Sequence, residues 1–235
     1  MDDAHGAEKA AAARAAVARL RPGMRLALGT GSTASDAVRA IAGRFSARDS
    51  LTCVASSSAT ETLARELGLS VGPLRPTDRF DLMIDGADEV DPSLSLTKGG
   101  GGALFREKFL ARRSAELVIL VDPSKLVPHL GTRSPIPVEV VPFARDAIVA
   151  ELARRSIPAK VRMGGPDGGP FRTDNDLEIL DLRPAQATED VGRLDAELHA
   201  LPGVVETGLF VRLASLVLVG HSDGSVEERR PPPSH

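Results

Sequence analysis

Four short apolar segments in the first half of the chain each end in a polar cluster. The segments are residues 24–28, 51–55, 79–84 and 117–121, and the clusters after them are 29–33, 56–58, 85–91 and 122–125. Helices are predicted at residues 7–20, 34–45, 61–67 and 103–116. Strands that alternate with helices predict a doubly wound, mostly parallel α/β sheet of the Rossmann-like kind, with right-handed crossovers. The four clusters should then lie outside the carboxyl ends of the strands, where ligands bind in such sheets.

The pattern changes near Pro135-Ile136-Pro137. Strands are predicted at residues 138–141, 159–163, 177–182 and 204–211, with helices at 143–155 and 189–200. This β-α-β-β-α-β order is typical of a ferredoxin-like α+β domain. We therefore expect a Rossmann-like catalytic domain (residues 1–132 and 211–226), a smaller ferredoxin-like domain (133–210) and a disordered tail (227–235), because the tail is charged and rich in proline.

The composition of the chain disfavours several classes of partner. Its 235 residues are 42% hydrophobic and carry a net charge of −3, which gives no reason to expect nucleic acid or a membrane surface. No segment has the apolar length needed to span a bilayer. Cys53 is the single cysteine, so no internal disulfide can form and a reducing, cytoplasmic location is expected. The five histidines are scattered, so we predict no histidine-based metal site.

Residues 85–108 read D-G-A-D-E-V-D-P-S-L-S-L-T-K-G-G-G-G-A-L-F-R-E-K. The stretch combines clustered carboxylates, which repel, with a glycine run that costs about 0.5–1 kcal/mol per residue to order. Sequences carry such conflicts mainly at functional sites. The carboxylates suit a solvated loop, a metal loop that lacks the EF-hand spacing, or a site that holds sugar hydroxyls with Lys98 balancing the charge. Their position directly after a predicted buried strand favours the third interpretation.

The turn Gly29-Thr30-Gly31-Ser32-Thr33-Ala34 lies between a predicted strand and a predicted helix. Backbone N–H groups and the helix dipole favour an anion there, and two hydroxyl side chains add donors. The turn also fits the dinucleotide pattern G-x-G-x-x-A. A nicotinamide site needs an acidic residue after the second strand, where this chain has Ser56–Ser58. A single phosphate is therefore the favoured ligand.

Glu107 lies on the apolar side of its predicted helix and should be partly buried. The alternative is an exposed glutamate paired with a nearby cation, which contributes little energy. Lys98 and Lys125 are placed to stabilise a developing oxyanion, or are ordinary surface charges. The glycines at 99–102 form either a flexible linker or a place where a substrate approaches the backbone closely.

Taken together and in this order, these motifs resemble ribose-5-phosphate isomerase of the A type across nearly the whole chain. The matching segments are G-T-G-S-T-A (29–34), S-S-S (56–58), D-G-A-D-E (85–89), K-G-G-G-G-A-L-F-R-E-K (98–108), D-P-S-K (122–125), P-V-E-V (137–140), T-D-N (173–175) and L-P-G-V-V-E-T-G-L-F (201–210). The family usually has T-D-N-G-N where this chain has T-D-N-D-L, which puts only that turn's geometry in question.

The resemblance implies a metal-free and cofactor-free aldose–ketose isomerase that interconverts ribose 5-phosphate and ribulose 5-phosphate in the non-oxidative pentose phosphate pathway. It implies Glu107 as the base in an enediolate mechanism, with Asp85 and Lys98 as further catalytic residues. The implied substrate-binding residues are Lys9, Thr30, Gly31, Ser32, Thr33, Asp85, Gly86, Ala87, Asp88, Lys98, Gly99, Gly100, Gly101 and Lys125. A homodimer or homotetramer is implied as well. Two alternatives remain, a sugar-phosphate-sensing regulatory module, which normally carries a helix-turn-helix, and a nicotinamide-dependent dehydrogenase.

Overall fold

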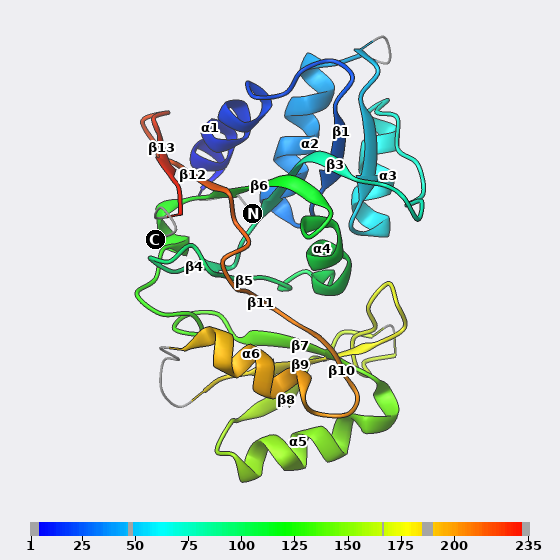
Figure 1. Cartoon of the computed structure of the whole chain (residues 1–235), viewed down its shortest axis with the longest axis vertical. Helices are drawn as coiled ribbons and strands as arrows, with labels where there is room; N and C mark the ends of the chain where they lie inside the picture. The colour runs from blue at the N-terminus through cyan, green and yellow to red at the C-terminus, as the bar shows by residue number, and fades with distance from the viewer. Residues whose placement is uncertain (1–4, 47–48, 166, 185–189, 232–235) are drawn as a thin grey trace. The chain divides into compact units, whose positions relative to one another are not determined.

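The computed structural model describes residues 5–46, 49–165, 167–184 and 190–231 (Figure 1), which fall into two compact units. The first unit comprises the described residues of Met1–Ala87, Arg106–Leu126 and Leu213–His235. The second unit comprises those of Asp88–Phe105 and Val127–Arg212. Residues 88–105, which we expected in the larger domain, thus group with the second unit.

The first unit is built on a six-stranded sheet with the order β13-β12-β6-β3-β1-β2. Its strands are β1 (Arg25–Leu28), β2 (Thr52–Ala55), β3 (Phe80–Gly86), β6 (Ser114–Val121), β12 (Leu216–Gly220) and β13 (Val226–Arg229). Its helices are α1 (Gly6–Val17), α2 (Ser32–Arg44) and α3 (Ser58–Glu66), and α4 (Leu104–Ala111) begins in the second unit and continues into the first. All pairings are parallel except that of β12 with β13, so the predicted mostly parallel sheet is confirmed.

Across the described residues, no helix has the length and apolar character that a membrane crossing requires.

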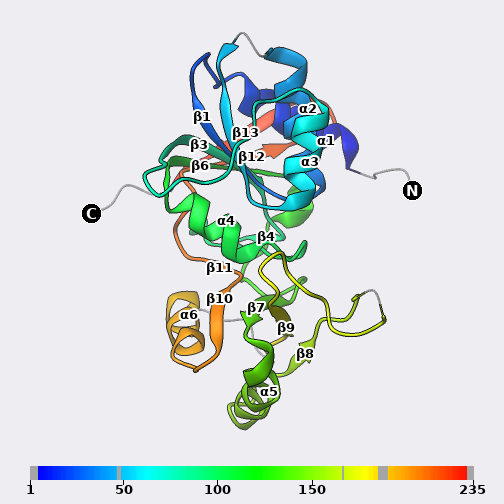
Figure 2. The ribbon, with the colours of Figure 1, turned by 90° about the vertical axis from the view of Figure 1, so that its right-hand side faces the viewer.

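One face of this sheet packs against an alanine-rich helix surface. Alternate strand residues such as Leu26 and Leu82 join Ala12 and Ala16 of α1 in one buried cluster. Because alanine side chains are small, α1 approaches the sheet closely. The approach also depends on Gly220, where an added Cβ atom would lie 1.9 Å from the backbone oxygen of Glu8. Figure 2 shows α1, α2 and α3 together on one side of the strands.

Two predicted boundaries in this unit are wrong. The helix predicted to reach residue 116 ends at Ala111, and β6 begins at Ser114, which pairs with Phe80. The first half of β6 is partly exposed and polar, so its sequence lacks the apolar run that marks a strand. Residues 227–229, predicted to open a disordered tail, instead belong to β13 (Val226–Arg229), which pairs with β12. The tight turn between the two strands contains Gly224 at φ +85°. Residues 232–235 of that tail lie outside the described residues.

The second unit contains an antiparallel sheet with the order β10-β7-β9-β8. Its elements follow as β7 (Ile136–Val140), α5 (Arg145–Arg154), β8 (Ala159–Val161), β9 (Glu178–Leu182), α6 (Val191–His199) and β10 (Val204–Thr207). This is the predicted β-α-β-β-α-β order. Side chains of α5 and α6 pack against the same alternate residues of β7 and β9, so both helices cover one face of the sheet.

A small sheet in the second unit was not predicted. Its strands are β4 (Glu89–Val90), β5 (Leu96–Thr97) and β11 (Leu209–Phe210), in the order β11-β5-β4. The predicted strand 204–211 is divided by Gly208 into β10 and β11. A Cβ atom at Gly208 would lie 2.3 Å from the backbone oxygen of Lys98, so only glycine allows the two segments this close.

Candidate active site

The polar clusters of the first unit gather at one edge of its sheet. β1 pairs in parallel with both β2 and β3, and β3 pairs in parallel with β6. Their carboxyl ends therefore point the same way. The segments that follow or end these strands are Gly29–Thr33, Ser56–Ser58, Asp85–Gly86 and Asp122–Lys125. This edge carries the predicted phosphate turn and the predicted sugar-binding carboxylate Asp85.

Asp85 is fully buried at the end of β3. Its Oδ1 accepts hydrogen bonds from the backbone N–H groups of Gly86 (2.8 Å) and Thr30 (3.2 Å). The carboxylate lies directly against Gly29, where an added Cβ atom would be 2.0 Å from its Cγ. Two backbone donors and a missing side chain thus fix the carboxylate beside the β1–α2 turn.

A hydroxyl network holds the β1–α2 turn in place. The Thr30 hydroxyl contacts Ser56 Oγ at 2.7 Å and Ser57 Oγ at 2.9 Å. Thr60 Oγ1 donates to the backbone oxygen of Gly29 at 2.9 Å. The sequence argument counted the serines as a polar cluster and a family motif and used them against a nicotinamide site, but it missed this positioning role. The signal available was their place at the end of the second strand, beside the phosphate turn.

A buried lysine faces the start of α2. Lys9 is 9% exposed, and its Nζ donates to Ser32 Oγ at 3.1 Å. Ser32 is the first residue of α2, and Gly31 before it has φ +108°, which a residue with a side chain rarely adopts. An ammonium group, a hydroxyl and the positive end of a 13-residue helix therefore meet, as an anion site requires.

Glu107 lies in α4 and is 3% exposed, in line with the burial expected from the helical wheel. Lys108, the next residue, is also buried, at 1% exposure. A carboxylate in such surroundings is shielded from bulk water, which suits it to proton transfer with a bound substrate.

The glycine run of the second unit is an ordered turn and not a flexible linker. Gly99 and Gly102 have φ values of +102° and +83°. The Gly100 N–H donates to Asp88 Oδ2 at 2.8 Å, and Arg162 donates to the Gly99 carbonyl at 2.8 Å. A Cβ atom at Gly100 would lie 2.7 Å from Asp88 Oδ1. Asp88 therefore holds the backbone of the run closely.

Lys98 is 3% exposed and lies at the end of β5. Its backbone N–H donates to the Gly208 carbonyl at 2.9 Å. Its Nζ lies 5.5 Å from the centroid of the Phe210 ring, within the range of a cation–π contact. A buried ammonium of this kind is not an ordinary surface charge, the alternative that the sequence left open.

Two carboxylates of the acidic cluster have structural partners. Asp91 Oδ1 accepts from the backbone N–H groups of Ser93 and Ser95 and so closes its own turn. Glu89 is fully buried and accepts three backbone N–H groups, from residues of the 131–134 loop at 2.5–2.8 Å. Sequence distance hid this role, because the loop follows Glu89 by more than forty residues.

We expect Glu89→Gln to lower the free energy of unfolding by about 2–4 kcal/mol, because an amide NH₂ would face backbone N–H donors that have lost their charged acceptor. Urea denaturation followed by circular dichroism measures this. Glu197→Gln is the matched control, since Glu197 pairs on the surface with Arg193, whose side chain is 76% exposed. That control should change stability by less than about 1 kcal/mol. Equal stability of the two variants would contradict the role of Glu89.

The P-V-E-V and T-D-N motifs meet in the second unit. Glu139 is fully buried in β7 and accepts from Thr173 Oγ1 at 2.7 Å and from Asn175 Nδ2 at 3.2 Å. Burial raises the pKa of Glu139, against the lowering effect of these bonds and of one from the backbone N–H of Phe105. Phe105 lies in the first turn of α4. Glu139 therefore forms hydrogen bonds both with that turn and with the T-D-N loop.

Asp122 begins the short 3₁₀ helix that carries Lys125. Burial acts to raise the pKa of Asp122, but hydrogen bonds from Ser124, together with nearby His5 and Lys125, outweigh it and leave the pKa below its ordinary value. Asp122 is therefore an anion at neutral pH. Lys125 itself is half-buried.

Comparisons with known proteins agree on one family. Residues 52–224 match the family described as ribose 5-phosphate isomerase A (phosphoriboisomerase A). Ribose-5-phosphate isomerase A of Chloroflexus aurantiacus is 48% identical over 218 residues, which cover 92% of this chain and 90% of that protein. The enzyme of Thermomicrobium roseum is 46% identical, with 92% and 91% covered.

Solved structures agree with the sequence matches. Ribose 5-phosphate isomerase A of Methanocaldococcus jannaschii superposes with a TM-score of 0.88 at 36% identity, covering 94% of this chain and 97% of that one. A D-ribose-5-phosphate isomerase in complex with phospho-erythronic acid gives the same values.

Proposed function

The chain belongs to the ribose 5-phosphate isomerase A family and interconverts D-ribose 5-phosphate and D-ribulose 5-phosphate, and we propose that Glu107 moves the proton between C1 and C2 through an enediolate. The reaction is an aldose–ketose isomerisation, an internal redox change that fits the non-oxidative pentose phosphate pathway. The observation that carries the assignment of the base is the burial of Glu107, which is 3% exposed on α4. It supports a carboxylate kept from bulk water for proton transfer.

Asp85 and Lys98 are proposed to act on the oxygens of the substrate. The C–H group next to the substrate carbonyl can lose its proton to the base only if the negative charge on the enediolate oxygens is stabilised. Lys98 supplies a buried ammonium for that charge. Asp85, held by the N–H groups of Thr30 and Gly86, supplies a fixed acceptor for a sugar hydroxyl, as ring opening requires.

The phosphate group is proposed to bind at the start of α2. The support is the meeting of Lys9 Nζ, Ser32 Oγ and the helix N-terminus in the first unit. The phospho-erythronic acid bound by the solved relative joins a phosphate to a carboxylate, whose two oxygens resemble the oxygen pair of an enediolate. The remaining proposed substrate contacts are Thr30, Gly31, Thr33, Gly86, Ala87, Asp88, Gly99, Gly100, Gly101 and Lys125.

Incubation with ribose 5-phosphate is expected to give ribulose 5-phosphate, detected by NMR of the sugar carbons, without any added cofactor. Activity should persist in excess EDTA, because the proposed chemistry uses only side chains. A reaction that requires NAD, or no conversion under any condition, would contradict the assignment. Activity lost in EDTA and restored by a divalent ion would point back to a metal at the carboxylate cluster.

Assembly and location stay predictions. We propose a cytoplasmic homodimer or homotetramer, from the family resemblance and from the single cysteine. Burial raises the pKa of the Cys53 thiol to about 12, so the thiol stays protonated and unreactive in the folded chain. Light scattering measures the assembly directly.

A further inference from the structure

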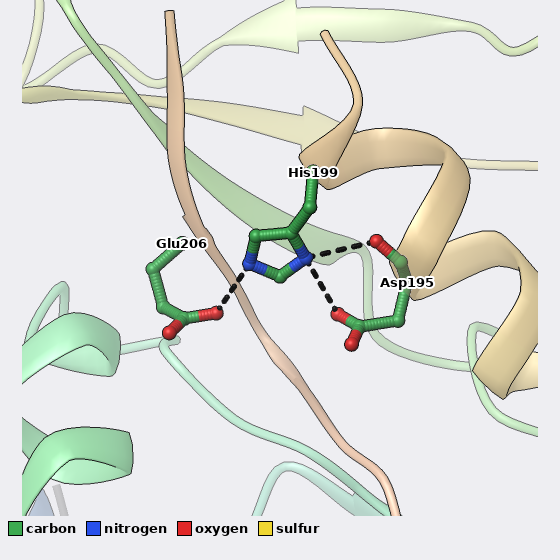
Figure 3. Close-up of side chains that lie close together, drawn as sticks. All are labelled: Asp195, His199 and Glu206. Carbon is green, nitrogen blue, oxygen red and sulfur yellow. Dashed lines mark hydrogen bonds and ion pairs between the residues drawn. The ribbon is translucent and has the colours of Figure 1, made fainter.

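The second unit carries a histidine between two carboxylates. His199 and Asp195 lie four residues apart on α6, and Glu206 lies on β10, across a short turn. Figure 3 shows the imidazole ring between the two carboxylate side chains, with Glu206 on one side and Asp195 on the other. Among the described residues, one atom from each of these three side chains lies within 4.8 Å of the others. The prediction from scattered histidines did not foresee this group, which the fold assembles.

The contacts of the ring fix the role of each nitrogen. His199 Nδ1 lies 2.9 Å from the backbone oxygen of Asp195 and 3.4 Å from its Oδ1. Both oxygens only accept hydrogen bonds, so Nδ1 carries the hydrogen. Nε2 lies 3.0 Å from Glu206 Oε1, which is again an acceptor. A lone pair on Nε2 would face a carboxylate oxygen and be repelled, and a metal ion bound by both atoms would remove that repulsion.

The hydrogen bonds of the His199 ring match those of histidines that bind a metal ion. A histidine that binds a metal through one nitrogen donates its other N–H to a carboxylate or a backbone carbonyl, and Asp195 offers His199 both. Two ligands bound to one zinc ion at bond lengths of about 2.0–2.2 Å lie roughly 3–3.5 Å apart. Nε2 and Glu206 Oε1, at 3.0 Å, have that spacing.

The carboxylates are held in place by one buried residue. Thr207 is fully buried, and its backbone N–H donates to Glu206 Oε1 at 2.8 Å. Its hydroxyl donates to Asp195 Oδ1. The side chain of His199 is 37% exposed, which leaves room for an ion to enter and for water to complete its coordination. Two carboxylates with a neutral imidazole carry a charge of −2, which a divalent ion neutralises and a single proton does not.

We propose that His199 Nε2 and Glu206 bind a divalent transition-metal ion of the Zn²⁺ class, with Asp195 orienting the imidazole. Imidazole with carboxylate suits Zn²⁺ and its neighbours better than Ca²⁺ or Mg²⁺, which prefer oxygen ligands. The ion joins α6 to β10 and stabilises the second unit. The site is separate from the proposed isomerase chemistry, which uses none of these residues.

Titration with ZnCl₂ by calorimetry at pH 7.5 tests the proposal on the full chain. We expect one wild-type site that is lost in both His199→Gln and Glu206→Gln, and weakened about 10–100-fold in Asp195→Asn. His221→Gln is the control, because His221 has its carboxylate neighbour Glu227 at 4.0 Å, and it should keep the site. Circular dichroism of each variant verifies its fold.

The melting temperature gives a second readout that does not depend on activity. At a Zn²⁺ concentration near one hundred times Kd, the wild-type Tm should rise by about 5–10 °C, and that of His199→Gln should not. The proposal is overturned if the wild type binds no Zn²⁺. Equal stoichiometry and affinity in His199→Gln would overturn it as well.

Discussion

Glu107→Gln is expected to lower kcat for ribose 5-phosphate isomerisation by about 10³–10⁴-fold, because the amide cannot accept the proton that leaves C2. The side chain keeps its size and its buried position on α4, so substrate binding should change little. Calorimetric titration of the inactive variant with ribose 5-phosphate measures that binding. Loss of kcat with retained affinity separates a base from a residue that only shapes the site.

Glu116→Gln provides the matched control for this variant. Glu116 belongs to the same unit but lies in the exposed half of β6. Its substitution should leave kcat and KM within about twofold of wild type, since surface changes of this kind are usually small. A kcat for Glu107→Gln within a few-fold of wild type would remove Glu107 from the role of base.

Gly29→Ala is expected to lower kcat/KM by about 10²-fold or more. The new Cβ atom would lie 2.0 Å from Cγ and Oδ1 of Asp85, so the carboxylate must move. Asp85 is fixed by its buried position and by two backbone N–H groups, and a displacement near 1 Å at a reacting group costs about two orders of magnitude. Gly29 does not have a positive φ, so the loss would report on Asp85 and not on backbone strain.

Gly43→Ala is the corresponding control. Gly43 lies in α2 with nothing within 4 Å of an added Cβ atom. Alanine at a helical position should stabilise the fold by about 0.5–1 kcal/mol and leave kcat/KM unchanged. If Gly29→Ala kept wild-type activity at unchanged stability, Asp85 would not be held where the reaction needs it.

The parallel sheet was predictable because its signal is local. Each apolar run of four to eight residues and the polar cluster after it lie side by side in the sequence, as with β3 and Asp85. The small sheet was not predictable, since β5 and β11 are two-residue strands whose partners Leu96 and Phe210 are far apart in the chain. Short strands with distant partners leave no periodicity to detect.

In the candidate site, too, local features were predictable from the sequence and contacts between distant residues were not. The burial of Glu107 followed from its place on a helical wheel, and the turn at Gly29–Thr33 from its motif. The roles of Glu89 and Ser57 did not, because each depends on a partner that only folding brings near. For His199, the spacing to Asp195 was visible in the sequence, but the approach of Glu206 required the turn into β10.

Exchange of the substrate C2 hydrogen with solvent tests the central claim most directly. Ribose 5-phosphate deuterated at C2 is incubated with enzyme in H₂O, and NMR follows both the loss of label and its appearance at C1 of ribulose 5-phosphate. The wild type should release or transfer the deuterium with a primary isotope effect, and Glu107→Gln should do so about 10³–10⁴-fold more slowly. If Glu107→Gln removes the deuterium from C2 at close to the wild-type rate, another group is the base.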